Sequence, residues 1–177
     1  MSESNFYFRI ATAEDTPILK QLIESAFRAE DTRQGWVGIP ELASGFSIEE
    51  KQIASGVADP NTVFLIARDE HEHLLGTIGA SKRGSEVARL FMLAVDPRLH
   101  RGGTGRAILD YAEQYCKREW KSRVISLDAL STRESLIAWY LRRGYRQTGE
   151  TNLFPREKCK DLDLPEDLHF VELEKEV

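Results

Sequence analysis

The sequence has few cysteines, no long apolar run and no excess of positive charge, and each shortage excludes a class of protein. Two cysteines among 177 residues, Cys116 and Cys159, cannot form a disulfide framework and are typical of a reducing compartment. No run approaches the roughly 20 apolar residues that a membrane-spanning helix needs, and the first residues lack the basic segment and apolar core of a secretion signal. We therefore expect a cytoplasmic protein that binds no membrane.

The net charge of −5 argues against nucleic acid as a partner, because binding to the phosphate backbone depends on a basic surface. An acidic balance is compatible with a cationic substrate such as an amine, although charge that serves only solubility would look the same. The length and the 41% apolar content suffice for one domain with a real core. Because no repeat or linker is visible, we predict a single domain over residues 1–177.

Apolar periodicity and helix caps predict the order of the secondary structure. The expected strands are residues 7–11, 62–68, 74–80, 87–95, 124–129, 145–150 and 168–174. Three of the expected helices begin at a capping pair: Thr12 with Asp15, Ser47 with Glu50, and Ser131 with Glu134. A fourth helix is expected to begin at Thr104. Gly144 is the expected left-handed stop of the last helix. The order is β-α-α-β-β-β-α-β-α-β-β.

The most informative stretch joins the apolar strand 90–95 to the helix that begins at Thr104. The turn between them is rich in glycine, so unpaired backbone N–H groups meet at a helix N-terminus, where phosphate binds well. A tight turn without a ligand would use the same glycines. We predict a phosphate-bearing cofactor on the backbone of six consecutive residues: Arg101, Gly102, Gly103, Thr104, Gly105 and Arg106.

Two common phosphate motifs do not fit this turn. A Walker loop requires Lys-Ser/Thr after its last glycine, but Gly105 is followed by Arg106 and Ala107. A dinucleotide fingerprint requires a third glycine where Ile108 stands. The cofactor is therefore of another kind.

The segment from His100 to Gly105 resembles the acyl-CoA signature of the GNAT N-acetyltransferases, Gln/Arg-x-x-Gly-x-Gly/Ala. Both glycines match, whereas His100 replaces the first residue and Arg101 can take part of its role. The element order is also that of the GNAT family, so the resemblance covers nearly the whole chain. It implies an α/β (α+β) fold with a mixed, mostly antiparallel sheet flanked by helices and opening after its fourth strand. It also implies direct transfer of an acetyl group from acetyl-CoA to a primary amine.

The resemblance assigns roles to further residues. Tyr140, in a segment resembling the GNAT aromatic-Tyr pair before Gly-Tyr, would protonate the CoA thiolate; the alternative is an ordinary core tyrosine. Arg133 stands where the family often has Asn, so contacts to the pantetheine arm would pass to Ser131 and Ser135. A bulge in the fourth strand would expose backbone groups to the cofactor, and ordinary strand pairing is the alternative. Those backbone groups belong to Leu93, Ala94 and Val95.

The acceptor site is expected at residues 28–38, which wall this site in GNAT proteins. Glu30 and Asp31 could pair with a cationic amine and Trp36 could stack on it; alternatively, the charges are solvated and Trp36 packs inward. Residues 151–167 are a candidate for the other wall. The acceptor is a small-molecule or peptide amine of unspecified identity, and a homodimer is compatible with the sequence.

The general base is not identified. Arg89 sits near the place where some GNAT enzymes carry a carboxylate, and Glu86 lies at the strand entrance. We expect no metal, because His71, Glu72 and His73 have no third ligand at suitable spacing. Two other functions stay open: a Rossmann-like enzyme with Asp128 on a ribose, and an acyl-CoA sensor without turnover.

Overall fold

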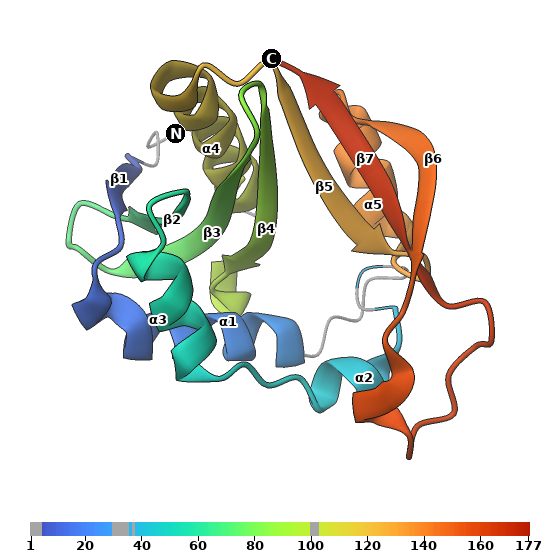
Figure 1. Cartoon of the computed structure of the whole chain (residues 1–177). Helices are drawn as coiled ribbons and strands as arrows, with labels where there is room; N and C mark the ends of the chain where they lie inside the picture. The colour runs from blue at the N-terminus through green and yellow to red at the C-terminus, as the bar shows by residue number, and fades with distance from the viewer. Residues whose placement is uncertain (1–4, 30–35, 37, 100–102) are drawn as a thin grey trace.

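The computed structural model describes residues 5–29, 36, 38–99 and 103–177, in which a seven-stranded sheet has the order β1-β2-β3-β4-β5-β7-β6 (Figure 1). The strands are β1 (Tyr7–Ile10), β2 (Thr62–Arg68), β3 (Leu74–Arg83), β4 (Val87–Val95), β5 (Val124–Leu130), β6 (Arg146–Leu153) and β7 (His169–Glu176). The helices are α1 (Thr16–Arg28), α2 (Pro40–Ser44), α3 (Glu50–Ala58), α4 (Thr104–Trp120) and α5 (Glu134–Arg142). Short 3₁₀ turns are η1 (Ala13–Asp15), η2 (Pro97–Leu99) and η3 (Arg156–Cys159).

The predicted mixed, mostly antiparallel sheet flanked by helices is confirmed. The predicted order is also confirmed apart from α2, a five-residue helix that is too short to show apolar periodicity. Gly144 follows α5 with φ +97°, as the helix stop predicted. The described helices include none that is both long and apolar enough to cross a bilayer.

Two of the predicted helix starts need correction or refinement. Thr12 and Asp15 do form a reciprocal pair, with the Thr12 N–H donating to the Asp15 carboxylate at 2.8 Å, but they open η1 rather than α1. The hydrogen bond from Arg9 and burial act oppositely on this carboxyl, and the first dominates, which lowers the pKa of Asp15 to about 2. The prediction of Ser47 as a cap is wrong: α3 begins at Glu50 after the cap residue Glu49.

One parallel pairing interrupts the otherwise antiparallel sheet, and it creates an opening between strands. β4 pairs with β5 only from Val87–Arg89 to Val124–Ser126. Beyond that point β4 continues to Val95 and β5 to Leu130 without pairing to each other. The two strands therefore part, as Figure 1 shows between the green and ochre arrows.

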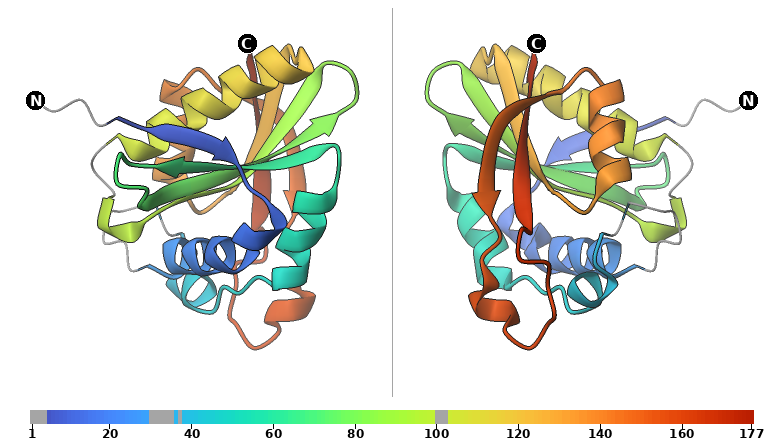
Figure 2. Two further views of the ribbon diagram at one scale, coloured as in Figure 1. Left: turned by 90° about the vertical axis from the view of Figure 1, so that its left-hand side faces the viewer. Right: turned by 90° about the vertical axis from the view of Figure 1, so that its right-hand side faces the viewer.

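The two faces of the sheet are covered by different helices (Figure 2). Residues of α4 and α5, such as Ile108, Leu109 and Ile137, pack with Ile125 and Leu173 of the sheet in one core cluster. A second cluster on the opposite face joins α1 and α3 to β2 and β4. The layer formed by α1 and α3 ends at β4. On that face of the sheet, α1 and α3 do not cover β5, β7 and β6.

A bulge in β4 reverses the direction of the side chains that follow it. Two residues, Met92 and Leu93, stand opposite Ile78 alone, and Met92 has φ +52°. Leu90 packs in the α4 cluster before the bulge, whereas Ala94 packs in the α1 cluster after it. Simple alternation would place both on the same face. The bulge expected from the family resemblance is confirmed.

Candidate active site

The N-terminus of α4 has the geometry of a phosphate site. Gly103 is its cap residue with φ +73°, and a Cβ added there would meet no atom of the described residues within 4 Å. The first hydrogen bond of the helix runs from the Ala107 N–H to the Gly103 carbonyl, so the N–H groups of Thr104, Gly105 and Arg106 have no acceptor within the helix. The described residues of the loop therefore fit an anionic group. His100, Arg101 and Gly102 lie outside the described residues.

The bulged part of β4 lies beside this helix start and turns one edge toward the opening. Ala94 and Val95 pair with Thr77 and Gly76 of β3 on the other edge. Because β5 has already separated, the backbone groups of Leu93 to Val95 that point away from β3 meet no strand in the described sheet. These groups can bind an extended, amide-bearing chain such as pantetheine.

Tyr140 belongs to α5, which packs on the same face of the sheet as α4 but beside β5 and β7, across the opening from β4. Its side chain is buried, with the rings of Trp139 and Tyr145 centred 5.2 and 5.6 Å away. Burial raises the pKa of Tyr140 to about 12, with Arg133 acting in the opposite direction and Asp128 in the same one. Its hydroxyl therefore holds its proton at neutral pH. Tyr140 is a core residue, as the alternative stated, and that position does not conflict with a role as a proton donor.

The start of α5 differs from its prediction. Ser131 is not the cap, because the helix begins at Glu134 after Arg133. Ser131 instead joins β7: its N–H donates to the His169 carbonyl at 2.8 Å and its Oγ accepts from the His169 N–H at 3.3 Å. Ser135 lies in the first turn of α5 and is half-buried.

The loop after α1 is anchored to this same helix start. The Arg133 Nε donates to the Trp36 carbonyl at 2.6 Å. The Trp36 ring meets Trp139 edge-on with 6.5 Å between centroids, and it is only half-buried. A Cβ on Gly38 would lie 2.6 Å from the Thr132 Oγ1, so the backbone passes close to α5. Glu30 and Asp31 lie outside the described residues.

The long segment between β6 and β7 covers the lower end of the uncovered half-sheet. Leu164 and Leu168 pack against Leu130 of β5, and Ile39 and Leu42 lie against the same cluster. Figure 1 shows this segment beside α2. Of the two walls that the sequence suggested, the described Trp36 and Gly38 lie against the start of α5, and residues of the second, such as Leu164, pack on β5.

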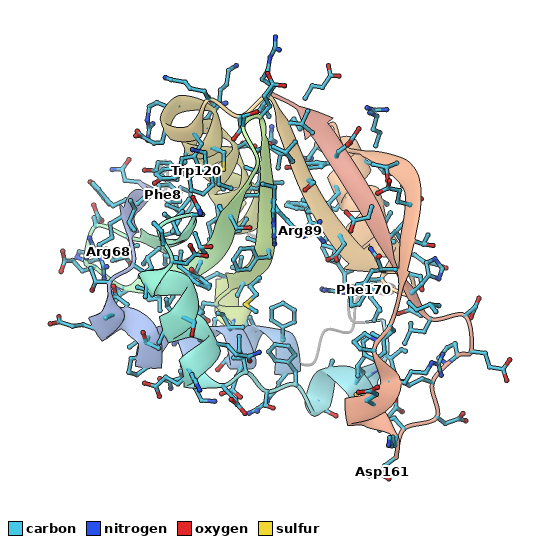
Figure 3. All side chains as sticks on the ribbon, viewed as in Figure 1. Phe8, Arg68, Arg89, Trp120, Asp161 and Phe170 are labelled. Carbon is cyan, nitrogen blue, oxygen red and sulfur yellow. The ribbon has the colours of Figure 1, made fainter. Side chains whose placement is uncertain are left out.

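A charged cluster that the sequence did not reveal lies where β4 and β5 part (Figure 3). The Arg89 guanidinium donates to Asp128 at 2.7 Å and to the two Glu172 oxygens at 3.0 and 3.2 Å. Glu86 lies apart from it, exposed and 3.4 Å from Arg123. Sequence reasoning considered Arg89 and Asp128 separately. No local signal could link them, since they belong to different strands.

Other features lie away from this region. A cavity of about 800 Å³ opens between α1, the β2–β3 turn and η2, lined by Leu22, His73 and Arg98 among others. Within the described ranges no group of three or more His, Cys, Asp or Glu could hold a metal. His73 pairs with Asp69 at 3.0 Å in an exposed turn.

The sequence matches the model of the acetyltransferase (GNAT) family over residues 19–145, which is most of the chain. The chain belongs to the GNAT acetyltransferase family. No curated protein matches this GNAT sequence. The Rossmann-like alternative is wrong, because the sheet is mostly antiparallel and Asp128 faces Arg89.

Solved GNAT structures share the fold across nearly their whole length. A GNAT acetyltransferase from Elizabethkingia anophelis with acetyl-CoA bound has a TM-score of 0.71 at 14% identity, covering 99% of this chain and 100% of that one. The ribosomal-protein-S18-alanine N-acetyltransferase from Escherichia coli has a TM-score of 0.69 at 17% sequence identity, and the match covers 98% of this chain and 94% of that one. The PaiA N-acetyltransferase from Thermoplasma acidophilum, in complex with coenzyme A, has a TM-score of 0.66 at 16% sequence identity. The match covers 98% of this chain and 99% of that one.

Proposed function

We propose that this GNAT protein transfers the acetyl group of acetyl-CoA directly to a primary amine. The proposal is supported by three features whose elements share one core cluster: the glycine-capped start of α4, the bulged edge of β4 and the Tyr140 side chain. Acyl transfer from a thioester needs a bound cofactor, stabilisation of the oxyanion and a proton for the leaving thiolate. The three features supply one requirement each.

The residues divide the work as follows. The amides of residues 101–106 bind the CoA pyrophosphate, and the backbone of Leu93, Ala94 and Val95 binds pantetheine and the thioester oxygen. Ser131 and Ser135 lie beside the pantetheine arm. Burial raises the pKa of Tyr140 to about 12, so its hydroxyl carries a proton at neutral pH. We assign it the transfer of that proton to the leaving sulfur as the C–S bond breaks, and the tyrosinate regains a proton from the newly acylated nitrogen.

The acceptor side is formed by Trp36 and residues 151–167, and we assign Glu30 and Asp31 to the same wall. The structural relatives include a spermidine N-acetyltransferase from Vibrio cholerae and the S18-alanine enzyme, which act on a polyamine and on a protein. Both products arise from a primary amine. We therefore propose a small-molecule or peptide amine as the acceptor.

Release of CoA thiol from acetyl-CoA tests the function. The panel comprises spermidine, L-lysine, an aminoglycoside, an arylamine and a peptide with an N-terminal alanine. We expect acceptor-dependent thiol release and an acetylated product of matching mass with at least one class. CoA binding without turnover on any of them would favour the sensor and contradict the transferase.

Replacing Gly103 with valine should weaken CoA binding at least tenfold, about 1.4 kcal/mol. The added side chain would occupy the open space in front of the α4 amides and would disfavour the left-handed backbone. Calorimetric titration with CoA measures the loss.

Gly84→Val is the matched control for that strain. Gly84 has φ +76° and open space around its Cβ position, but it lies in the turn between β3 and β4. We expect Gly84→Val to lose stability and to keep CoA affinity. Unchanged CoA binding by folded Gly103→Val protein would contradict the assigned phosphate site.

A further inference from the structure

The charged cluster of Arg89, Asp128 and Glu172 places two carboxylates side by side at the parting of β4 and β5. Asp128 and Glu172 are directly opposite each other in the pairing of β5 with β7. Like charges in that position repel, and Arg89 bridges them from β4. One guanidinium against two carboxylates leaves an excess of one negative charge. That excess suits an ammonium group.

The two carboxylates are not equivalent. Glu172 accepts two hydrogen bonds from Arg89 and one from the Asn152 amide at 3.3 Å, and its side chain is 13% exposed. Asp128 accepts one bond, on Oδ2, and its side chain is 36% exposed. Its Oδ1 has no hydrogen-bond partner in the described part of the chain. Asp128 is therefore the carboxylate with an oxygen available to a ligand.

The position of Asp128 suits an amine that attacks a thioester held at the β4 bulge. Arg89 pairs with Ser126, so Asp128 lies two residues past this pair on β5 and Leu93 four residues past it on β4. Met92 and Leu93 share one level opposite Ile78, so the difference in level along the strands is one residue, about 3.3 Å. An acetyl carbonyl bound at Leu93 and an amine held at Asp128 therefore lie at nearly the same level of the opening between the strands. Arg89, which holds Asp128 at 2.7 Å, belongs to the same strand as the bulge, so the carboxylate is tied to the edge of β4 that Leu93 continues.

We propose that Asp128 is the general base of the transfer, with Arg89 and Glu172 as positioning residues. This inference rests on the proposed function. The carboxylate of Asp128 takes one proton from the acceptor ammonium, and the neutral amine forms the new C–N bond. The C–S bond breaks as Tyr140 gives its proton to the thiolate. The second proton of the amine returns to the tyrosinate, and Asp128 releases its proton to solvent.

The pH dependence follows from the charged groups that act on Asp128: Arg89 from β4 and Glu172 from β7. Burial raises the pKa of Asp128, Arg89 lowers it and Glu172 raises it. The base acts only when ionised, so kcat falls as the pH drops through the pKa of Asp128. If the charge of Glu172 is removed, Asp128 is the only carboxylate that pairs with Arg89, so the pKa of Asp128 should fall.

The experiment compares Asp128→Asn with Glu172→Gln, using the panel amine on which the wild-type protein is most active. Asp128→Asn should lower kcat at least tenfold at pH 7, and the loss should shrink toward pH 10, where more of the amine is already neutral. Glu172→Gln should lower kcat less than Asp128→Asn does and should move the acidic limb of the pH profile of kcat to lower pH. CoA affinity should stay the same in both variants.

The result separates a base from a structural tie between three strands. If Asp128→Asn lowers the melting temperature but keeps the wild-type pH profile of kcat, or if Glu172→Gln alone removes the acidic limb, the assignment is overturned. Absence of thiol release by the wild-type protein on every amine would instead contradict the proposed function. Glu86→Gln, which alters an exposed carboxylate paired with Arg123, serves as the control for nonspecific charge effects.

Discussion

Tyr140→Phe should lower kcat by roughly 10²-fold, within the usual range for loss of a general acid. The substitution keeps the ring that packs against Trp139 and Tyr145 and removes only the hydroxyl. Without that proton source, the thiolate must leave unprotonated or take a proton from water. Steady-state thiol release at saturating acetyl-CoA measures the effect, while CoA affinity and melting temperature should change little.

Tyr145→Phe is the matched control for this prediction. Tyr145 is also buried, lies next to Tyr140 and would lose the same atom, but its side chain lies beside Glu113 and Lys175. We expect its kcat to stay within about twofold of the wild type, since no assigned step uses its hydroxyl. Equal kcat in Tyr140→Phe and wild-type protein would leave Tyr140 as a packing residue only.

Lys175→Met should destabilise the fold by about 3 kcal/mol at pH 8, because it leaves a buried carboxylate without its partner. The Lys175 ammonium donates to both oxygens of Glu113, at 2.7 and 3.0 Å. The Glu113 side chain is 3% exposed, so water cannot replace the lost charge. Urea denaturation gives the free energy of unfolding.

The destabilisation should depend on pH in a defined direction. Burial raises the pKa of Glu113, and Lys175 partly offsets that rise. A group whose folded pKa lies above its unfolded value of about 4.3 binds more protons in the folded state, so stability falls as pH rises above that value. Loss of Lys175 raises the folded pKa further. The difference between variant and wild type should therefore be small near pH 4 and should grow toward pH 8.

Two further variants separate the charge effect from loss of side-chain packing. Lys117→Met removes an exposed lysine of α4 and should change stability by about 0.5 kcal/mol or less. The double variant Glu113→Met/Lys175→Met should recover much of the loss, because neither charge is then buried alone. A loss in Lys175→Met that is equal at pH 4 and pH 8 would show that packing, not charge, is responsible.

The sequence predicted most of the fold because the relevant signals are local. Strands β2 and β4 have the bounds that apolar runs and flanking turns indicated, and α4 begins at Thr104 as the glycines indicated. Helix caps were less reliable. Ser47 and Ser131 fit the capping pattern, yet Glu49 and Arg133 are the cap residues, because the pairing of Ser131 with β7 claims its polar groups.

The contacts between residues far apart in the sequence could not be predicted from local signals, because they depend on strand pairing and on the bulge in β4. Arg89 and Glu172 are 83 positions apart, and Arg133 and Trp36 are 97 apart, so their contacts exist only once β4, β5 and β7 are paired and α5 has docked. The bulge at Met92 reverses which side chains face α1, because two residues of β4 stand opposite one residue of β3 there.

The sequence by itself determined the order of elements, the glycine-capped helix and the position of Tyr140, because periodicity and backbone conformation are properties of neighbouring residues. The tertiary structure alone decided where a proton-accepting carboxylate could stand. Arg89 occupies the place on β4 where a carboxylate was sought. Asp128 reaches the same point from β5, because a parallel pairing of only three residues brings the strands together and then lets them part.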